Sequence, residues 1–284
     1  MTHCFYQIGG QRIRVSVPET WMYTDHGYLT PFLAEQGEAD RFLEFFPVDQ
    51  LSPPEGEQLF AKPDRQVFGL KDRRIVYVGS VAEGLGGAYL RISREGTISR
   101  IESLIRAFPF GMTSVVVMNA MELEHLTAKN RGFLLHASFI RWRDRAVLFT
   151  APSGTGKSTQ AELWRRECGA ELINGDRAIV RMEGDMALAC GVPFCGSSGV
   201  SKNVALPLAA IVCLSQAPET RISPLSGFQA FRRIWEGCSV NVWDRTDLSA
   251  CSQTVLDVLS TVPVYHLACT PDLTAVNALR RALE

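Results

Sequence analysis

The segment 150-TAPSGTGKST-159 contains the residue types that proteins use to hold a phosphate group. Gly154 and Gly156 let backbone N–H groups approach an anion closely. Lys157 can reach the terminal oxygens of a nucleoside triphosphate, and Ser158 can offer its hydroxyl to a magnesium ion. The other residues of the segment predicted to bind ATP are Ser153, Thr155 and Thr159.

Ala151 stands where the usual phosphate-binding loop has its first glycine. The following residue, Pro152, favours extended backbone at position 151, which alanine adopts readily. A strand predicted at 146–150 enters the loop and a helix predicted at 157–168 leaves it, and the positive end of that helix favours an anion. The alternative is a glycine-rich turn with no ligand.

A second candidate site residue is the acid that closes the apolar stretch 172-LINGD-176. A carboxylate at the end of a strand, one helix after a phosphate loop, is suited to holding magnesium. Asp176 is therefore predicted to be a metal ligand together with Ser158. Its alternative role is that of a turn or helix-cap residue.

Hydrophobic patterning divides the chain into two regions. In 11-QRIRVSV-17 polar and apolar residues alternate, which predicts a half-buried strand, and Gly9-Gly10 predicts a hairpin with 4–8. From about residue 112 strands alternate with helices, which indicates an α/β domain. We expect a β-rich domain over 1–110, with a role in substrate recognition, and a nucleotide-binding domain over 111–284. The expected helices are 111–132, 157–168, 226–237, 247–261 and 271–284.

Composition limits the classes of partner and compartment. The 284 residues are 46% hydrophobic and 21% charged, and the net charge of −1 predicts neither nucleic-acid nor membrane binding. The 8 cysteines show no metal-binding spacing, so we expect buried, reduced thiols. The first residues carry no signal-peptide pattern. These features together predict a cytoplasmic protein.

Three stretches, 134-LLHAS-138, 152-PSGTGKS-158 and 172-LINGDRAIV-180, carry a family resemblance. They resemble the HPr kinase/phosphorylase family and its relatives, which share a nucleotide core with ATP-dependent phosphoenolpyruvate carboxykinase. The resemblance covers roughly 112–205, about a third of the chain. It implies an α/β fold whose P-loop core is a mixed sheet flanked by helices, after a smaller β-rich domain. It also implies ATP and Mg²⁺ as cofactors.

The chain departs from the family at Gly175. The family has two adjacent acids before the arginine, and here the pair is Gly175-Asp176, before Arg177. The absent acid is the one that the family uses as a base, and the family counterpart of His136 faces the γ-phosphate. His136 is therefore predicted to act as the base, with Lys157 and Asp176 as the other catalytic residues. A histidine of the protein core is the alternative.

The segment 191-GVPFCGSSGVSKNVALP-207 is predicted to lie over the acceptor. Its candidate residues are Ser197, Ser198, Lys202 and Asn203. An ordinary surface loop is the alternative. The HPr signature is absent from this segment, so the predicted acceptor is a serine on a peptide or small protein rather than HPr itself.

Two other functions stay open from the sequence. One is a small-molecule kinase or carboxykinase-type enzyme, which would need an arginine-lined pocket. The other is a nucleotide-binding scaffold with little or no catalysis, as a consequence of Gly175. Family members often form oligomers, so a homo-oligomer is also implied by the resemblance.

Overall fold

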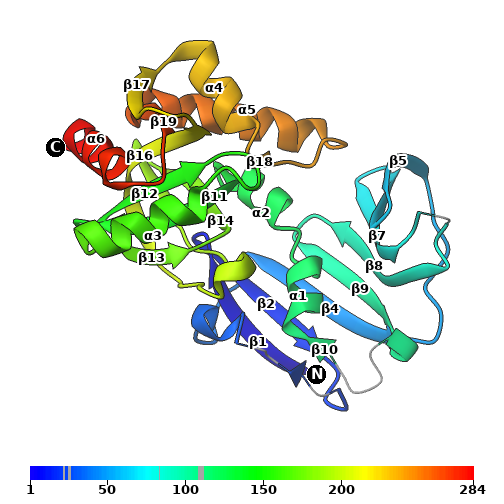
Figure 1. The fold of residues 1–284 in the computed structure, drawn as a ribbon. Helices are drawn as coiled ribbons and strands as arrows, with labels where there is room; N and C mark the ends of the chain where they lie inside the picture. Colours follow the sequence, from blue (N-terminus) through cyan, green and yellow to red (C-terminus); the bar gives the residue numbers. More distant parts are fainter. Residues whose placement is uncertain (22, 25–26, 83, 108–111) are drawn as a thin grey trace. The chain divides into compact units, whose positions relative to one another are not determined.

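The computed structural model describes residues 1–21, 23–24, 27–82, 84–107 and 112–284. Its contacts divide the chain into two units, Met1–Glu122 and Leu123–Glu284. The first is rich in strands and the second mixes strands with helices, which confirms the α/β fold class with a β-rich N-terminal part (Figure 1). The expected domain boundary between 110 and 111 lies outside the described residues, and the division after Glu122 comes later in the chain.

The N-terminal unit is built on an eight-stranded sheet. In spatial order its strands are β1 (Thr2–Ile8), β2 (Gln11–Val17), β4 (Arg41–Val48), β9 (Ile98–Leu104), β8 (Gly87–Glu95), β7 (Arg73–Ser80), β6 (Arg65–Leu70) and β5 (Glu57–Lys62). The predicted hairpin is confirmed, because Gly9 and Gly10 have positive φ values and β1 pairs antiparallel with β2. The unit also contains β3 (Tyr23–Thr24), η1 (Thr30–Phe32), η2 (Ile105–Ala107) and β10 (Met112–Thr113).

The single helix expected over 111–132 is wrong. The structure has two short helices there, α1 (Ser114–Ala120) and α2 (Leu123–Lys129). Between them Glu122 has a φ of 48° and its carboxylate pairs with the buried Arg94 at 3.1 Å. Gly132 begins a strand instead of ending a helix. A tertiary ion pair and a left-handed residue thus interrupt a pattern that is helical by periodicity.

The second unit has nine strands that do not lie in one simple layer. The main path is β12 (Arg145–Thr150), β11 (Gly132–Trp142), β14 (Arg177–Glu183), β15 (Met186–Cys190), β16 (Ala205–Gln216), β19 (Val264–Cys269) and β17 (Arg221–Leu225). β13 (Glu171–Asn174) and β18 (Cys238–Ser239) also pair with β11. β11 pairs with β14 over its first residues and with β12 over its last ones. β16 pairs with β15 at its start and with β12 and β19 further on. These two long strands therefore connect the two halves of the sheet.

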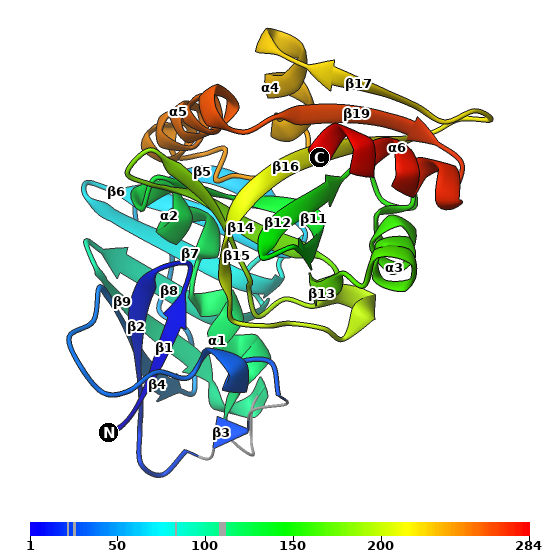
Figure 2. The same cartoon turned by 90° about the vertical axis from the view of Figure 1, so that its left-hand side faces the viewer.

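Two hydrophobic cores lie on the faces of these strands. α3 (Lys157–Cys168) and α6 (Leu273–Leu283) lie side by side in both views (Figures 1 and 2). Trp164 of α3 is fully buried there and meets Trp142 edge to face at 5.1 Å. The other core lies under α4 (Gly227–Trp235) and α5 (Arg245–Thr261). Five of the eight free cysteines are buried, as the apolar sequence around them predicts.

The helices predicted in the C-terminal half agree with the structure to within a few residues. α3 begins at Lys157 and ends at Gly169 in the left-handed conformation, as glycine at a helix end favours. Strands β14, β15, β17 and β18 were not predicted, because short strands between turns leave little periodicity. No helix among the described residues is long and apolar enough to cross a bilayer.

Candidate functional site

The phosphate-binding loop predicted from the sequence joins β12 to α3. Gly154 and Gly156 have φ values of 78° and 117°, a region that residues with a side chain rarely adopt. A β-carbon at either position would meet nothing within 4 Å. Backbone conformation, and not lack of space, therefore requires glycine at both positions.

Ala151 is compatible with this loop because it keeps a negative φ. Its carbonyl accepts a hydrogen bond from Lys157 Nζ at 2.9 Å, and the carbonyl of Pro152 accepts another at 3.2 Å. The buried Lys157 is thus held over the loop that its own helix follows. Burial lowers the pKa of Lys157, while the negative charge of Asp176 opposes that shift.

The remaining loop residues face solvent at the start of α3. Ser153, Ser158 and Thr159 are exposed, and Thr155 is half-buried. The first N–H groups of an α-helix have no partner inside the helix and carry partial positive charge. An anion resting on this loop would therefore meet N–H donors, the Lys157 ammonium and the Ser158 hydroxyl.

His136 and Asp176 come together from two neighbouring strands. His136 on β11 is paired in register with Arg177, the first residue of β14. This pairing puts His136 Nδ1 3.5 Å from Asp176 Oδ1. Thr150, at the end of β12, donates its hydroxyl to the backbone carbonyl of His136 at 2.9 Å. The imidazole therefore lies beside the acid, and the backbone of His136 is joined to the strand that enters the phosphate-binding loop.

The charges around His136 favour its neutral form. Burial lowers its pKa most, and the positive charges of Lys157 and Arg177 act in the same direction. Asp176 opposes these effects. A histidine whose pKa lies below the usual value is neutral near pH 7 and can accept a proton.

The corner that carries Asp176 is built by Asn174. Its side chain is fully buried, and its Oδ1 accepts hydrogen bonds from the N–H groups of Asp176 and Arg177, both at 2.9 Å. Its Nδ2 donates to the carbonyls of Val192 and Phe194 at 2.9 and 2.7 Å. One amide thus joins the acid corner to the following loop. The sequence signal for this role was an asparagine before Gly-Asp, a common turn pattern.

The structure leaves no room for a side chain at position 175. A β-carbon at Gly175 would lie 2.3 Å from Ser198 Oγ and 2.5 Å from Ser198 Cβ. Neither distance is compatible with a side chain at position 175 unless the turn η3 (Gly196–Ser198) moves. The position of this turn therefore requires glycine at 175.

The four predicted substrate-loop residues have different surroundings. Ser197 and Ser198 are exposed, with Ser198 against Gly175. Asn203 is exposed. The ammonium of Lys202 is paired with Glu171, at the far end of β13 from the acid corner. Three steps along a strand span about 10 Å, so this pair holds Lys202 away from Asp176.

Two hollows border the phosphate-binding loop. One, of about 550 Å³, is lined by Gly154–Gly156 and by Gln216 to Pro218 of the β16 end. The other, of about 460 Å³, lies on the His136 side. The residues lining this second hollow, called the acceptor cleft below, are His136, Thr150, Ala151, Pro152, Arg177, Cys213, Leu214, Arg233, Glu236, Gly237, Cys238 and Ser239.

Arg233 is a charged cleft residue that the sequence did not identify as a site residue. It lies on α4, in the last turn of the helix. In the structure it lines the acceptor cleft together with Arg177, whose guanidinium stacks on Phe194 and pairs with Asp176. The sequence contains no local signal for this, since α4 is placed against the cleft by its packing on α5.

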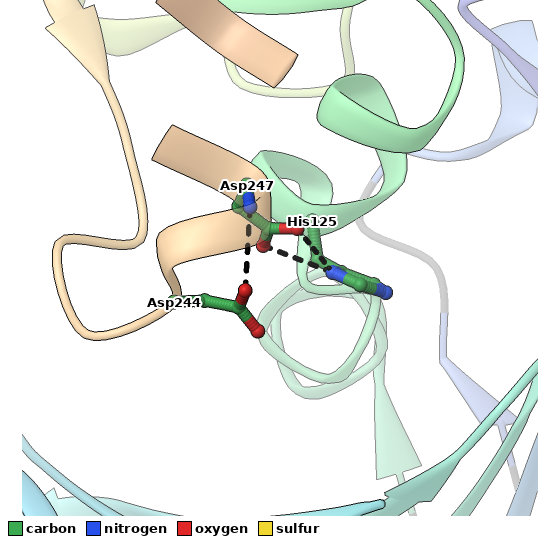
Figure 3. A group of neighbouring side chains, drawn as sticks. All are labelled: His125, Asp244 and Asp247. Atoms are coloured by element: carbon green, nitrogen blue, oxygen red, sulfur yellow. Dashed lines mark hydrogen bonds and ion pairs between the residues drawn. The ribbon is translucent and has the colours of Figure 1, made fainter. Parts of the chain in front are cut away.

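A separate buried polar group lies where α2 meets α5 (Figure 3). His125 Nδ1 lies 2.9 Å from both carboxylate oxygens of Asp247, and Asn241 donates to the same carboxylate at 3.0 Å. Asp244 caps α5 by accepting from the N–H groups of Thr246 and Asp247. Imidazole and carboxylate atoms of this kind can ligate a metal, but the hydrogen bonds among them already account for their burial.

Comparisons with known proteins add little to this geometry. No protein-family model matches the chain, and no curated protein matches it. Among solved structures, the Hpr(Ser) kinase/phosphatase from Coxiella burnetii aligns with 52% of this chain and 89% of its own, at 13% sequence identity and a TM-score of 0.30. At that score the likeness is a distant one of fold, so inference about chemistry depends on the residues themselves.

Proposed function

We propose that this protein is an ATP-dependent phosphotransferase that uses magnesium and phosphorylates a serine, or a similar hydroxyl, on a peptide or small protein. One observation carries the proposal. Lys157, His136 and Asp176 converge beside a glycine loop, with His136 Nδ1 3.5 Å from Asp176 Oδ1 and the Lys157 charge acting on His136. A loop with no ligand would not need a buried lysine at this position.

Each group has a distinct role in this proposal. The loop N–H groups and Lys157 neutralise the charge of the β- and γ-phosphates. The Ser158 hydroxyl and the Asp176 carboxylate are hard oxygen donors, which suit Mg²⁺. Together they position the phosphoryl group and stabilise its charge, which is most of the catalysis in phosphoryl transfer.

His136 supplies the base in place of the acid that position 175 lacks. With Nδ1 protonated and facing Asp176, Nε2 can accept the proton of the attacking hydroxyl. Phosphoryl transfer has a loose transition state, so positioning matters more than the strength of the base. For this reason an imidazole is sufficient for transfer to serine.

Lys157→Ala tests the proposal, and Lys129→Ala is the matched control because Lys129 is an exposed lysine of the same unit. We expect the wild type and Lys129→Ala to bind Mg-ATP in calorimetry and to transfer labelled phosphate to serine peptides. Lys157→Ala should lose about 10²–10³-fold in transfer rate, as when one charge-stabilising donor is removed. Absence of nucleotide binding by the wild-type protein would contradict the proposal.

A second candidate acceptor is a small hydroxy acid, and one observation favours it. Arg177 and Arg233 both line the acceptor cleft beside His136, and a cleft of about 460 Å³ suits a small molecule. Arginine is well suited to binding a carboxylate. Free serine and hydroxy acids should be compared with serine peptides as acceptors. For a small acid, Arg233→Ala would raise KM much more than it lowers kcat.

A further inference from the structure

The loop after β15 is attached to the acid corner by several independent contacts. Asn174 donates to the carbonyls of Val192 and Phe194, and the Lys202 N–H donates to the carbonyl of Ile173 at 3.1 Å. The Arg177 guanidinium lies 5.3 Å from the centre of the Phe194 ring. The turn at the tip of this loop is therefore held at the corner of Asp176 and is not a freely moving surface segment.

The tip of the loop packs against the backbone of the corner. Ser198 occupies the space that a side chain at 175 would need, at 2.3 Å from Oγ to the β-carbon position. A β-carbon at Gly196 would lie 2.9 Å from Asp176 Cβ. These two close approaches put the Ser198 hydroxyl against residue 175, the neighbour in sequence of the acid that we place at the phosphoryl group.

The Ser198 hydroxyl can be redirected without breaking the fold. It donates to the Cys195 carbonyl at 2.7 Å and accepts from the Val200 N–H at 3.2 Å, both within its own turn. Gly196 and Gly199 flank the turn with φ values of 54° and 66°. Ser198 itself is exposed. A short turn between two left-handed glycines can shift by a small backbone rotation.

We propose that Ser198 is an internal phosphoryl acceptor, so that the protein phosphorylates its own substrate loop in cis. This inference rests on the proposed function. Ser198 Oγ forms a bond to the γ-phosphorus of ATP while the bond from that phosphorus to the β–γ bridging oxygen breaks. ADP leaves, and the hydroxyl proton passes to solvent water at the exposed turn.

Phosphorylation at this point has a physical consequence for the loop. A phosphoserine carries close to two negative charges, and here it would stand beside Asp176 in a space already filled by the hydroxyl. Like-charge repulsion and lack of room would move the turn away from the corner. Self-phosphorylation would thereby open the acceptor side of the site to an external hydroxyl.

The test uses the full chain, Mg-ATP, intact-mass measurement and phosphopeptide mapping. We expect one phosphoryl group on Ser198, added at a rate per molecule that does not depend on protein concentration. Ser198→Ala should lose the modification and still bind ATP, and Ser197→Ala, the neighbour in the same turn, should keep it. Lys157→Ala should show no modification.

The outcomes separate this inference from the proposed function. Transfer to an external serine with Ser198 unmodified would overturn the inference and leave the function standing. Modification mapped to Ser197, or a rate proportional to protein concentration, would overturn it as well. Absence of ATP binding in the wild type would overturn both.

Discussion

His136 is the residue whose charge state controls the proposed chemistry. Burial, Lys157 and Arg177 lower its pKa, and Asp176 raises it. A base is active when deprotonated, so the lowered pKa keeps His136 active at pH 7 and its activity declines only below its ordinary range. The protonation of this one imidazole therefore reports on the arrangement of the charges around it.

The pKa of His136 should move in opposite directions in two variants. Asp176→Asn removes the charge that favours the protonated ring, so the pKa should fall further. Arg177→Gln removes a positive charge, so the pKa should rise. Both shifts are measurable from the pH titration of the His136 ring proton in NMR spectra of the unliganded protein. A rise in Asp176→Asn would contradict the geometry of the pair.

Gly175→Asp introduces an acid next to Asp176, and we expect this single change to destabilise the protein. The new side chain meets Ser198 at 2.3–2.5 Å, an overpacked contact that costs about 1–3 kcal/mol. The double variant Gly175→Asp with Ser198→Gly should recover most of that loss. Urea unfolding of the wild type, the two single variants and the double variant measures the coupling free energy between positions 175 and 198. Equal stability of the single variant and the wild type would show that the turn yields freely.

At the scale of elements, the site depends on how α2 and α5 are joined. The buried pair of His125 and Asp247 crosses between these helices, and α5 packs on β11, the strand that carries His136. The buried pair therefore helps to hold α5, and through α5 the strand of His136, in position. A buried hydrogen-bonding group that loses its partner costs much more than an exposed one.

Asp247→Ala should lower the free energy of unfolding by about 1–3 kcal/mol, because His125 and Asn241 would both lose their acceptor. Asp257→Ala, in a partly exposed ion pair of the same helix with Arg131, should change it by less than about 1 kcal/mol. Denaturant unfolding compares the two variants. If they lose equal stability, the buried network does not support the helix pair.

At the scale of the whole molecule, the predicted site residues all belong to one of the two units. Each predicted site residue falls within Leu123–Glu284, which has its own cores. The N-terminal unit has a hollow of about 840 Å³ on its sheet, lined by arginine and glutamate side chains such as Arg73, Arg91 and Glu102.

A fragment of residues 123–284 expressed alone should therefore fold and bind Mg-ATP with an affinity similar to that of the full chain. Transfer to a peptide acceptor should fall sharply if the first unit recognises the substrate. Calorimetry and a transfer assay give the two readouts. Full transfer activity of the fragment would show that the N-terminal unit has another role.

The features that depend on a few neighbouring residues could be predicted from the amino-acid sequence. The strand, glycine loop and helix around Lys157 follow from local conformational preference, as does the hairpin at Gly9-Gly10, and their positions were predictable. Asp176 could be selected because it closes an apolar stretch one helix after the phosphate loop, and His136 because a family resemblance covered its short motif.

The contacts between residues far apart in the chain could not be predicted and became visible in the folded protein. The pairing register of β11 with β14 brings His136 to Asp176, and the packing of α4 brings Arg233 to the cleft. The ion pair of Glu122 with Arg94 accompanies the break in a helix that looks continuous by periodicity. In the sequence, Gly175 stands out only as a missing acid. In the structure, Ser198 fills the space that a side chain at position 175 would need. A close approach between two loops cannot be predicted, because it has no local sequence pattern.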